Sequence, residues 1–312
     1  MIKTAIVTGS AGFIGGHLTE GLLREGYKVV GIDNMRSGLQ STVDLHISYD
    51  NFIPKYYDIR SEKIDTVFRE HRPDAVFHLA AISGVVPSIK EPVISDDINV
   101  NGTVNILNIA QKYKCKRVVF SSSSSVYGGS DILPTPESVP LNPRSPYALQ
   151  KKIGEEYCKM FSDVYGLDTV CLRYFNVFGP RQRADSAYAA VVSAFCDNLK
   201  NNTAPTIYGD GEQTRDFCFV ENVVSANILA ANYNKKLNGE SFNVGCGKKI
   251  TINNLAKIIG TLPPRYEDKR QGDVDKSQAD ITKIKNILDY NIKTSFEEGV
   301  KNTVRWHLKE NK

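Results

Sequence analysis

The sequence predicts an α/β protein with a doubly wound parallel sheet and a smaller, mixed α/β C-terminal lobe. Three observations lead to this prediction. Short apolar runs alternate with segments of helical periodicity through the first half of the 312 residues. Some of these runs, such as residues 75–81, are apolar almost throughout, which is typical of strands covered on both faces. A glycine-rich turn joins the first apolar run to the first helical segment, as in doubly wound folds.

The expected elements alternate regularly along the first half of the chain. Strands are expected at residues 2–8, 28–33, 52–59, 75–81, 117–122 and 168–175. Helices are expected at residues 13–25, 61–70, 96–113 and 145–165. After about Gly179 the elements become short and mixed, so we expect domains at 1–179 and 180–312. A further strand near 241–244 is a candidate to return to the main sheet.

Composition and charge argue against several classes of protein. Charged residues make up 24% of the chain, and the formal net charge of +4 is spread along it, so no nucleic-acid partner is expected. No apolar stretch approaches 18 residues, and the N-terminus runs directly into a strand-like segment, so we expect neither a membrane span nor a signal peptide. A cytoplasmic location follows as the expectation.

Cysteines and histidines show no metal-ligand spacing. The six cysteines are widely separated and include no Cys-x-x-Cys pair, which favours buried free thiols over disulfides. The five histidines form no ligand pattern either. We therefore expect no metal site.

Residues 8–15, TGSAGFIG, have the properties of a phosphate-binding turn between a strand and a helix. Gly9 permits the tight turn, Gly12 lets the backbone approach a pyrophosphate, and Gly15 lets the helix pack on the sheet. Asp33 ends the second expected strand, where a carboxylate can accept both adenosine ribose hydroxyls and would repel a 2′-phosphate. NAD is therefore favoured over NADP, although Arg36 leaves NADP open.

The glycines are spaced three and three, and with the following Phe-Ile-Gly they resemble the signature of the extended short-chain dehydrogenase/reductases. This branch corresponds to the NAD-dependent epimerase/dehydratase family, which includes nucleotide-sugar epimerases and dehydratases. The resemblance implies a Rossmann-type fold with NAD as cofactor. The cofactor-binding residues that it implies are Gly9, Gly12, Phe13, Ile14, Gly15, Asp33, Asn34, Ser37, Gly38, Asp58, Ile59, Leu79, Ala80, Ala81, Asn99, Ser121, Tyr147, Lys151 and Phe175.

Tyr147 and Lys151 lie four residues apart, so they share one face of the expected helix. A phenol has an ordinary pKa of about 10, and poising it near pH 7 requires roughly 4 kcal/mol of stabilisation of the phenolate. A neighbouring ammonium would lower the tyrosine pKa, and a bound nicotinamide cation would lower it further. The pair alone occurs by chance in many helices; the resemblance makes both residues catalytic and Ser123 their hydroxyl partner.

The serine run at residues 121–125 has the composition of a linker, but an expected strand leads into it and Val-Tyr-Gly follows. In the family that the chain resembles, nucleotide-sugar dehydratases carry an Asp-Glu pair where this chain has Ser124 and Ser125. Neither hydroxyl can act as the extra acid or base that elimination of water requires. Dehydration is therefore not expected.

Three further motifs resemble the substrate side of the epimerase subgroup: residues 173–182, 207–220 and 269–277. The resemblance implies phosphate contacts for Asn176, Arg215 and Arg270, which suits planar guanidinium groups, and a contact between Asp273 and the uridine ribose. The substrate residues that it implies are Ser83, Ser123, Ser124, Tyr147, Asn176, Gln182, Ala190, Tyr208, Arg215, Arg270, Asp273 and Ser277.

Ser277 bears on the size of the sugar. In the resembled subgroup a tyrosine at this position restricts the site to glucose and galactose, and a small residue leaves room for an N-acetyl group. Ser277, Gln182 and Ala190 are similar to the permissive members, whereas Ser83 would crowd a position that those members keep as glycine.

The resemblance therefore implies an NAD-dependent 4-epimerase of UDP-glucose and UDP-galactose that also accepts the N-acetyl sugars. It further implies a homodimer formed through the helices at 96–113 and 145–165. The alternatives are a UDP-glucuronate 4-epimerase or decarboxylase, a non-catalytic NAD-sensing protein, and an oxidoreductase that consumes soluble NAD.

Overall fold

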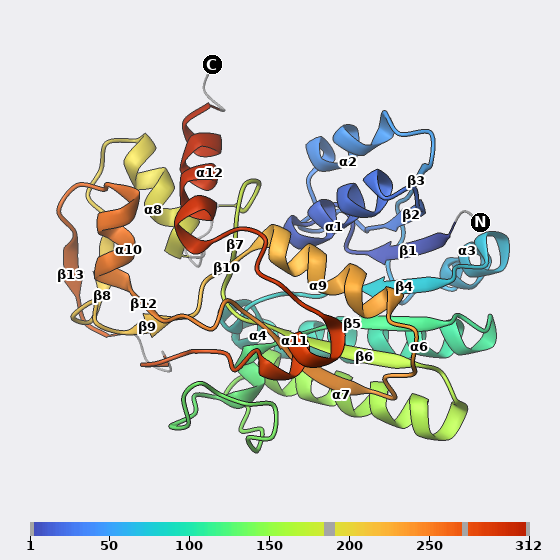
Figure 1. Cartoon of the computed structure of the whole chain (residues 1–312). Helices are drawn as coiled ribbons and strands as arrows, with labels where there is room; N and C mark the ends of the chain where they lie inside the picture. The colour runs from blue at the N-terminus through green and yellow to red at the C-terminus, as the bar shows by residue number, and fades with distance from the viewer. Residues whose placement is uncertain (1–2, 184–190, 270–273, 310–312) are drawn as a thin grey trace. The chain divides into compact units, whose positions relative to one another are not determined.

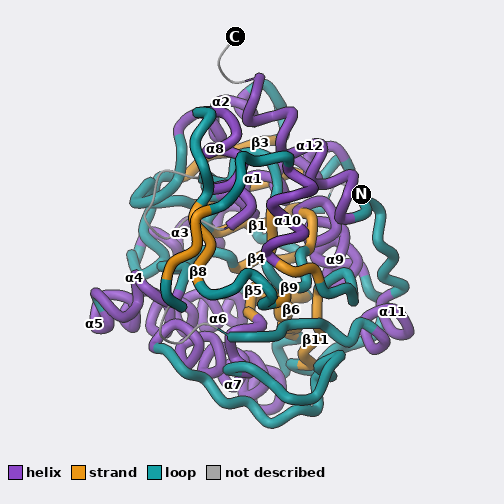
Figure 2. The backbone as a smooth tube through the Cα atoms, turned by 90° about the vertical axis from the view of Figure 1, so that its left-hand side faces the viewer, coloured by secondary structure: helices purple, strands orange, loops and turns teal. Residues whose placement is uncertain are grey.

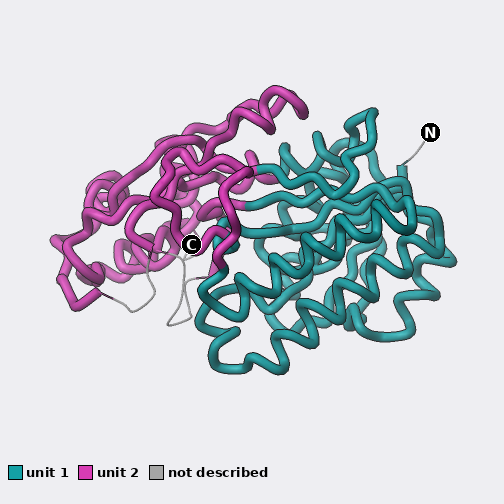
Figure 3. The backbone as a smooth tube through the Cα atoms, turned by 90° about the horizontal axis from the view of Figure 1, so that it is seen from below, with its two compact units in different colours: residues 1–126, 143–173, 224–242 teal, residues 127–142, 174–223, 243–312 magenta. Residues whose placement is uncertain are grey.

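A computed structural model describes residues 3–183, 191–269 and 274–309 of the chain. The chain forms two compact units, coloured separately in Figure 3. Unit 1 contains residues 1–126, 143–173 and 224–242, and unit 2 contains residues 127–142, 174–223 and 243–312.

Unit 1 is built around a seven-stranded sheet of order β11-β6-β5-β4-β1-β2-β3. Its strands are β1 (Thr4–Thr8), β2 (Lys28–Ile32), β3 (Phe52–Lys55), β4 (Ala75–His78), β5 (Arg117–Ser123), β6 (Thr169–Tyr174) and β11 (Glu240–Val244). The pairs β1–β2, β1–β4, β2–β3 and β4–β5 are parallel. Figure 2 shows these strands in one column from β3 to β11 with helices beside them. The predicted doubly wound fold is confirmed.

Helices cover both faces of this sheet. They are α1 (Phe13–Arg24), α2 (Gln40–Ile47), α3 (Lys63–His71), α4 (Val85–Lys90), α5 (Pro92–Asp96), α6 (Gly102–Lys112), α7 (Pro146–Tyr165) and α9 (Val220–Asn232). In Figure 1, α6 and α7 lie on one face, and α1 and α9 lie on the other. Gly21 of α1 permits the close approach of α9, because a Cβ there would stand 2.7 Å from the side chain of Val224.

Two strands end earlier than the sequence predicts. We expected β4 to continue to residue 81, but the N–H groups of Leu79 and Ala80 donate to Thr8 Oγ1 at 3.1 and 3.2 Å. Because these N–H groups bond the Thr8 side chain, the regular strand pairing of β4 ends at His78. The edge strand β3 ends at Lys55 instead of residue 59, because the chain turns there towards Asp58, whose carboxylate accepts the N–H of Arg60.

The helix expected at 96–113 begins with a π-helical turn, Asp97–Asn101, before α6 continues it. The sequence analysis missed α2, α4 and α5, which have 8, 6 and 5 residues. Segments this short complete too few turns for an apolar period to be identified.

Buried polar contacts hold residues 224–242 in unit 1. The sequence analysis expected a boundary near residue 179, with a strand near 241–244 as a candidate to return to the main sheet. The Arg117 guanidinium pairs with Asp168 and donates to the carbonyls of Ala230 and Tyr233 at 2.7 Å each. Asp168 in turn accepts the N–H of Leu237 at 2.8 Å. Three of these charge-assisted contacts join the segment to residues more than sixty positions away in the sequence.

The described residues of unit 2 form short paired strands and four α-helices. The strands are β7 (Val177–Phe178) with β10 (Cys218–Phe219), β8 (Thr206–Tyr208) with β13 (Arg265–Glu267), and β9 (Thr214–Arg215) with β12 (Ile250–Thr251). The helices are α8 (Val191–Lys200), α10 (Ile252–Ile259), α11 (Thr282–Leu288) and α12 (Phe296–Lys309). A buried aromatic cluster joins Phe178, Phe217, Phe219 and Phe296, with ring centroids 5.6 to 6.2 Å apart.

Asn243 attaches the loop at residues 127–142 to the rest of unit 2. Its amide donates to the Thr135 carbonyl at 2.9 Å, and its backbone N–H donates to Glu137 at 2.8 Å. Its carbonyl oxygen accepts the phenol of Tyr127 at 2.7 Å. This buried side chain therefore bonds groups at the start and in the middle of the loop.

The six cysteines are buried free thiols, as expected. None of the helices in the described part of the chain is both long and apolar enough to span a bilayer.

The packing of α7 on β5 determines where Tyr147 and Lys151 lie relative to the end of β5. Ser145 caps the helix by accepting the N–H of Ala148, and Gly166 ends it in the left-handed conformation at φ 70°. Between these ends, Gly154 faces the ring of Phe120 on β5, and a Cβ there would stand 2.4 Å from the ring Cζ atom. The helix can reach its observed depth only because residue 154 has no side chain.

Replacing Gly154 with alanine should therefore destabilise the protein by about 1–3 kcal/mol, the usual cost of overpacking a filled core. Urea denaturation measures this loss. Glu156→Ala, at an exposed position on the same helix, provides the control and should lie within about 0.5 kcal/mol of the wild type. Equal stability for Gly154→Ala and the wild type would show that α7 is not held at this depth.

Candidate functional site

The glycine turn at residues 9–15 has the close-packed backbone that a pyrophosphate-binding loop requires. Gly9 has φ 73°, and a Cβ there would stand 2.9 Å from the Ala80 nitrogen. A Cβ at Gly15 would stand 2.0 Å from the Gly9 carbonyl oxygen, so both positions require glycine. Gly12 precedes α1, whose first-turn N–H groups, from Phe13 onwards, can receive an anion. The residues present therefore fit the phosphates of a dinucleotide.

Asp33 lies directly beyond β2 and is bound to the turn. Its two oxygens accept the N–H groups of Ala11 and Met35, at 3.0 and 2.9 Å. Burial raises the pKa of Asp33, and these two hydrogen bonds oppose the increase. Gly38 packs against this carboxylate, since a Cβ there would stand 2.9 Å from an Asp33 oxygen.

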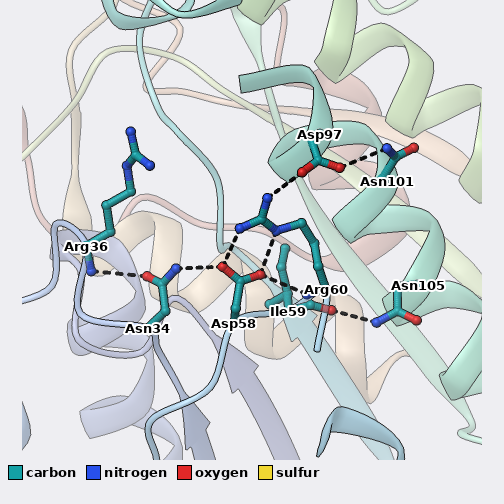
Figure 4. A network of polar contacts seen from close by, with 8 residues as sticks. All are labelled: Asn34, Arg36, Asp58, Ile59, Arg60, Asp97, Asn101 and Asn105. Carbon is teal, nitrogen blue, oxygen red and sulfur yellow. Dashed lines mark hydrogen bonds and ion pairs between the residues drawn. The ribbon is translucent and has the colours of Figure 1, made fainter. Parts of the chain in front are cut away.

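Asn34 and Asp58 belong to a polar network near the ends of β2 and β3 (Figure 4). The Asn34 amide donates to Asp58 at 2.9 Å, and its oxygen accepts the backbone N–H of Arg36 at 3.1 Å. The Arg60 guanidinium pairs with Asp58 at 2.8 Å and also with Asp97, so hydrogen bonds from Arg60 lower the pKa of Asp58. The network ties the loop after β3 to the π-helical turn.

Ile59 takes part in this network through its carbonyl oxygen, which accepts the Asn105 amide at 2.6 Å. Ser37 is exposed on the same loop as Asn34. The Arg36 side chain, which left NADP binding open, forms an ion pair with Glu91 at 3.0 Å. Its guanidinium is therefore engaged by a carboxylate in this structure.

A buried hydrogen-bond chain runs beneath the turn through His78, at the end of β4. Thr8 Oγ1 accepts two backbone N–H groups, so its hydroxyl donates to His78 Nδ1 at 2.7 Å. His78 Nε2 then donates to Thr103 Oγ1 at 3.0 Å, and Thr103 donates to the Asn99 carbonyl at 2.6 Å. The neighbours thus assign the neutral tautomer protonated at Nε2. Sequence analysis missed this chain, because its members lie far apart in the sequence.

Asn99 was expected to bind cofactor, and its side chain is engaged by protein groups. Its amide nitrogen donates to the Ile82 carbonyl at 3.0 Å and to Gln150 at 2.8 Å, and its oxygen accepts the Ile82 N–H at 2.8 Å. Gln150, between Tyr147 and Lys151 in the sequence, donates onward to Ser95 at 2.9 Å. Asn99 therefore connects the π-helical turn to α7. Leu79, Ala80 and Ala81 lie half-buried beyond β4, and Ser83 is exposed.

The structure brings Ser123, Tyr147 and Lys151 together where α7 meets the end of β5. The Tyr147 phenol is hydrogen-bonded to Ser123, and Lys151 Nζ donates to the Ser121 carbonyl at 2.7 Å. Lys151 Nζ lies 5.8 Å from the centre of the Tyr147 ring. The Tyr147 N–H donates to Ser88 Oγ at 3.0 Å, which fixes the start of the helix. Ser124 follows on a half-buried turn.

The electrostatics of this group differ from one expectation. We expected Lys151 to lower the pKa of Tyr147, but burial raises the pKa of the phenol to about 12, and the hydrogen bond with Ser123 only partly opposes it. Burial also lowers the pKa of Lys151 to about 8, against the attraction of Cys158 and Glu155. Desolvation of both groups outweighs their favourable contacts.

In unit 2, β9 gathers three of the expected substrate residues. The Thr214 carbonyl accepts Arg215 Nη1 at 3.0 Å and the Ser277 N–H at 3.1 Å. The Asn176 amide donates to the Asp216 carbonyl at 3.1 Å. Asn176, Arg215 and Ser277 are therefore fixed to the carbonyls of Thr214 and Asp216, two residues apart in one segment.

Polar atoms without partners among the described residues mark places that a polar ligand could satisfy. They include Thr214 Oγ1 and Gln182 Oε1 in unit 2, and Ser125 Oγ in unit 1. Phe175 is buried and Tyr208 ends β8. Ala190, Arg270 and Asp273 lie outside the described residues. No cluster of three metal-ligating side chains occurs in the described ranges.

Several known proteins are similar to this chain in sequence and structure. Residues 5–245 match the family described as "NAD dependent epimerase/dehydratase family". A UDP-glucose 4-epimerase from Thermotoga maritima, solved with UDP-glucose, is 38% identical with a TM-score of 0.93, over 99% of this chain and 100% of that chain. A UDP-N-acetylglucosamine 4-epimerase from Methanobrevibacter ruminantium, solved with UDP-N-acetylmuramic acid, is 38% identical with a TM-score of 0.94, over 99% of both chains. A UDP-glucuronate 4-epimerase from Thermodesulfobacterium geofontis is 36% identical over 98% of this chain and 96% of its own length.

The buried His78 makes the stability of the fold depend on pH. Its folded-state pKa is lowered to about 3 by burial, from an ordinary 6.5. The neutral ring therefore stabilises the fold above about pH 6.5, and this stability is lost as the pH falls towards 3. Between pH 7 and 4.5 the loss from this group should reach about 2.5 kcal/mol.

Urea denaturation of the wild type and His78→Gln at several pH values isolates this contribution, since glutamine does not titrate. The difference in unfolding free energy between the two proteins should shrink by about 2.5 kcal/mol between pH 7 and 4.5. Parallel curves would contradict a neutral buried His78.

Proposed function

The chain belongs to the NAD dependent epimerase/dehydratase family, and from that premise we propose that it is a 4-epimerase of UDP-hexoses. It is an isomerase that uses NAD and acts on a UDP-sugar. We propose UDP-glucose and UDP-galactose as substrates, together with their N-acetyl counterparts. The observation that carries this proposal is the arrangement of Ser123, Tyr147 and Lys151 in unit 1, which also contains the glycine turn.

Bound NAD supplies the acceptor and donor for the hydrogen at C4. Tyr147 takes the proton of the sugar 4-hydroxyl and later returns it, and Ser123 shares that proton through its hydrogen bond to the phenol. A 4-keto sugar is the transient intermediate, and its rotation in the site exposes the opposite face. Because the pKa of Tyr147 is raised to about 12, forming a free phenolate at pH 7 costs several kcal/mol. Proton transfer in step with the change at C4 avoids that cost.

Lys151 acts through its charge and its position. Its ammonium is fixed by the Ser121 carbonyl and stands near the Tyr147 ring, where it favours the negative charge that develops on the phenol. We propose that it also holds the nicotinamide ribose. The Ser124-Ser125 pair supplies no carboxyl for elimination of water, which supports epimerisation over dehydration.

The size of the sugar is proposed from unit 2. Ser277 is a small, half-buried residue attached to β9, and a small side chain at this position leaves space for an acetamido group. Both a UDP-glucose and a UDP-N-acetylglucosamine epimerase are similar to this chain, which supports the wider range. A UDP-uronate is the second candidate substrate, because one relative of similar identity is a UDP-glucuronate 4-epimerase.

The homodimer and the cytoplasmic location stay predictions. Exposed apolar side chains on the helices expected at the interface support the dimer. These are Leu149, Val164 and Tyr165 on α7.

Incubation with UDP-glucose and with UDP-N-acetylglucosamine, without added NAD, should yield the C4 epimer of each. Tyr147→Phe should reduce kcat by about 10³-fold, within the range for loss of a general base, and should leave NAD affinity within about 3-fold. Tyr56→Phe, at an exposed position just beyond β3, serves as the control. Full activity of Tyr147→Phe would contradict the mechanism. Turnover of UDP-glucuronate but of neither UDP-hexose would show that the substrate is the uronate.

A further inference from the structure

Glu155 is a buried acid on α7 that has no role in the mechanism above. It is 6% exposed, and it lies one helical turn beyond Lys151 and two turns beyond Tyr147, on the same face. Carboxylates are rarely buried to this extent without partners of opposite charge.

Both oxygens of Glu155 are held by fixed donors. Oε1 accepts the Ser122 hydroxyl and Arg173 Nε, the latter at 2.9 Å. Oε2 accepts Arg173 Nη2 at 2.6 Å and the Ser241 hydroxyl at 3.2 Å. The pairing with Arg173 is bidentate, and Arg173 is itself 5% exposed. Four donors from β5, β6 and β11 therefore hold this side chain in one position.

These contacts also continue a series along the helix. Tyr147, Lys151 and Glu155 occupy successive turns of α7, and each meets one of three consecutive serines at the end of β5. The contacts are Tyr147 with Ser123, Lys151 with the Ser121 carbonyl, and Glu155 with the Ser122 hydroxyl. A shift of α7 along β5 would break all three together.

The surroundings of Lys151 contain several titratable groups. From α7 they are Tyr147, Glu155 and Cys158; from β4, His78; and from β6, Cys171. Arg173 of β6 is paired with Glu155. The neutral tautomer of His78 carries no charge, and burial raises the pKa of the Cys171 thiol, which keeps it neutral. Glu155 is the one carboxylate among these groups, and it is ion-paired with Arg173. The Phe120 ring, 4.9 Å from Lys151 Nζ, adds a weaker attraction.

We infer that Glu155 is a positioning residue for the proposed reaction: it fixes α7 against β5 and supplies the negative charge that keeps the Lys151 ammonium protonated beside Tyr147. The inference rests on the proposed function for its kinetic readout. A purely structural ion pair between Glu155 and Arg173 would stabilise the fold without affecting the ionisation of Lys151.

The pH dependence of kcat/KM of the NAD-loaded enzyme separates these two roles. Lys151 must be protonated to act, so its deprotonation sets the alkaline limb of the profile. Glu155→Gln removes the charge and keeps the shape, and it should move this limb about 1 pH unit lower. At pH 9 the variant should then be about tenfold less active than the wild type, after each is normalised to its own optimum. Glu156→Gln, its exposed neighbour, should leave the limb in place.

Variants of Arg173 test the sign of the effect. Arg173→Gln removes a positive charge near Lys151 and should move the alkaline limb to higher pH. The double variant Glu155→Gln/Arg173→Gln removes both charges and should return the limb towards the wild-type position. A structural role predicts loss of stability in the single variants without opposite movements of the limb.

A folded Glu155→Gln protein with an unmoved alkaline limb overturns the inference. If Glu155→Gln fails to fold, Arg173→Gln decides, and a limb that stays in place or moves to lower pH overturns it. If the wild type turns over no UDP-hexose, the proposed function fails, and calorimetric titration with NAD across the same pH range replaces the kinetic readout. As the pH is raised, NAD affinity should begin to fall at a lower pH in Glu155→Gln than in the wild type. The same pH dependence of NAD affinity in both proteins overturns the inference.

Discussion

The contact between α7 and the end of β5 is the constraint on which the rest of the site depends. Gly154 lets the helix approach the ring of Phe120, and this depth brings Tyr147 to Ser123 and Lys151 to the Ser121 carbonyl. A side chain at position 154 would lift the whole face of the helix away from the sheet. The geometry of the proposed catalytic group is therefore a consequence of core packing, in which small changes of volume are transmitted directly.

Burial gives this contact its chemical character. Removing water raises the pKa of Tyr147 and lowers the pKa of Lys151, so both groups are held closer to their neutral forms than in solution. Beneath them, the hydrogen-bond chain through His78 contains donors and acceptors in a fixed order and carries no net charge. The site is therefore preorganised in an environment where a developing charge interacts strongly with the few charges near it.

Much of this arrangement could be predicted from the sequence, because it depends on local patterns. The sequence alone contains the glycine turn, the acid at Asp33 and the four-residue spacing of Tyr147 and Lys151. The role of Glu155 had a comparable signal, since it lies four residues beyond Lys151, but its partners come from other strands. The pKa of Tyr147 could not be predicted, because it depends on how deeply the phenol is buried, and residue spacing does not specify burial.

The central claim is that the chain's own residues move only the hydroxyl proton, while the hydrogen on C4 leaves and returns within the site. The most direct test uses UDP-glucose that carries deuterium at C4, incubated with the enzyme in ordinary water and analysed by mass spectrometry and NMR. The account predicts UDP-galactose that retains the deuterium at C4. Exchange of that deuterium with solvent during turnover would contradict it, because the label would then have left C4 as an exchangeable proton.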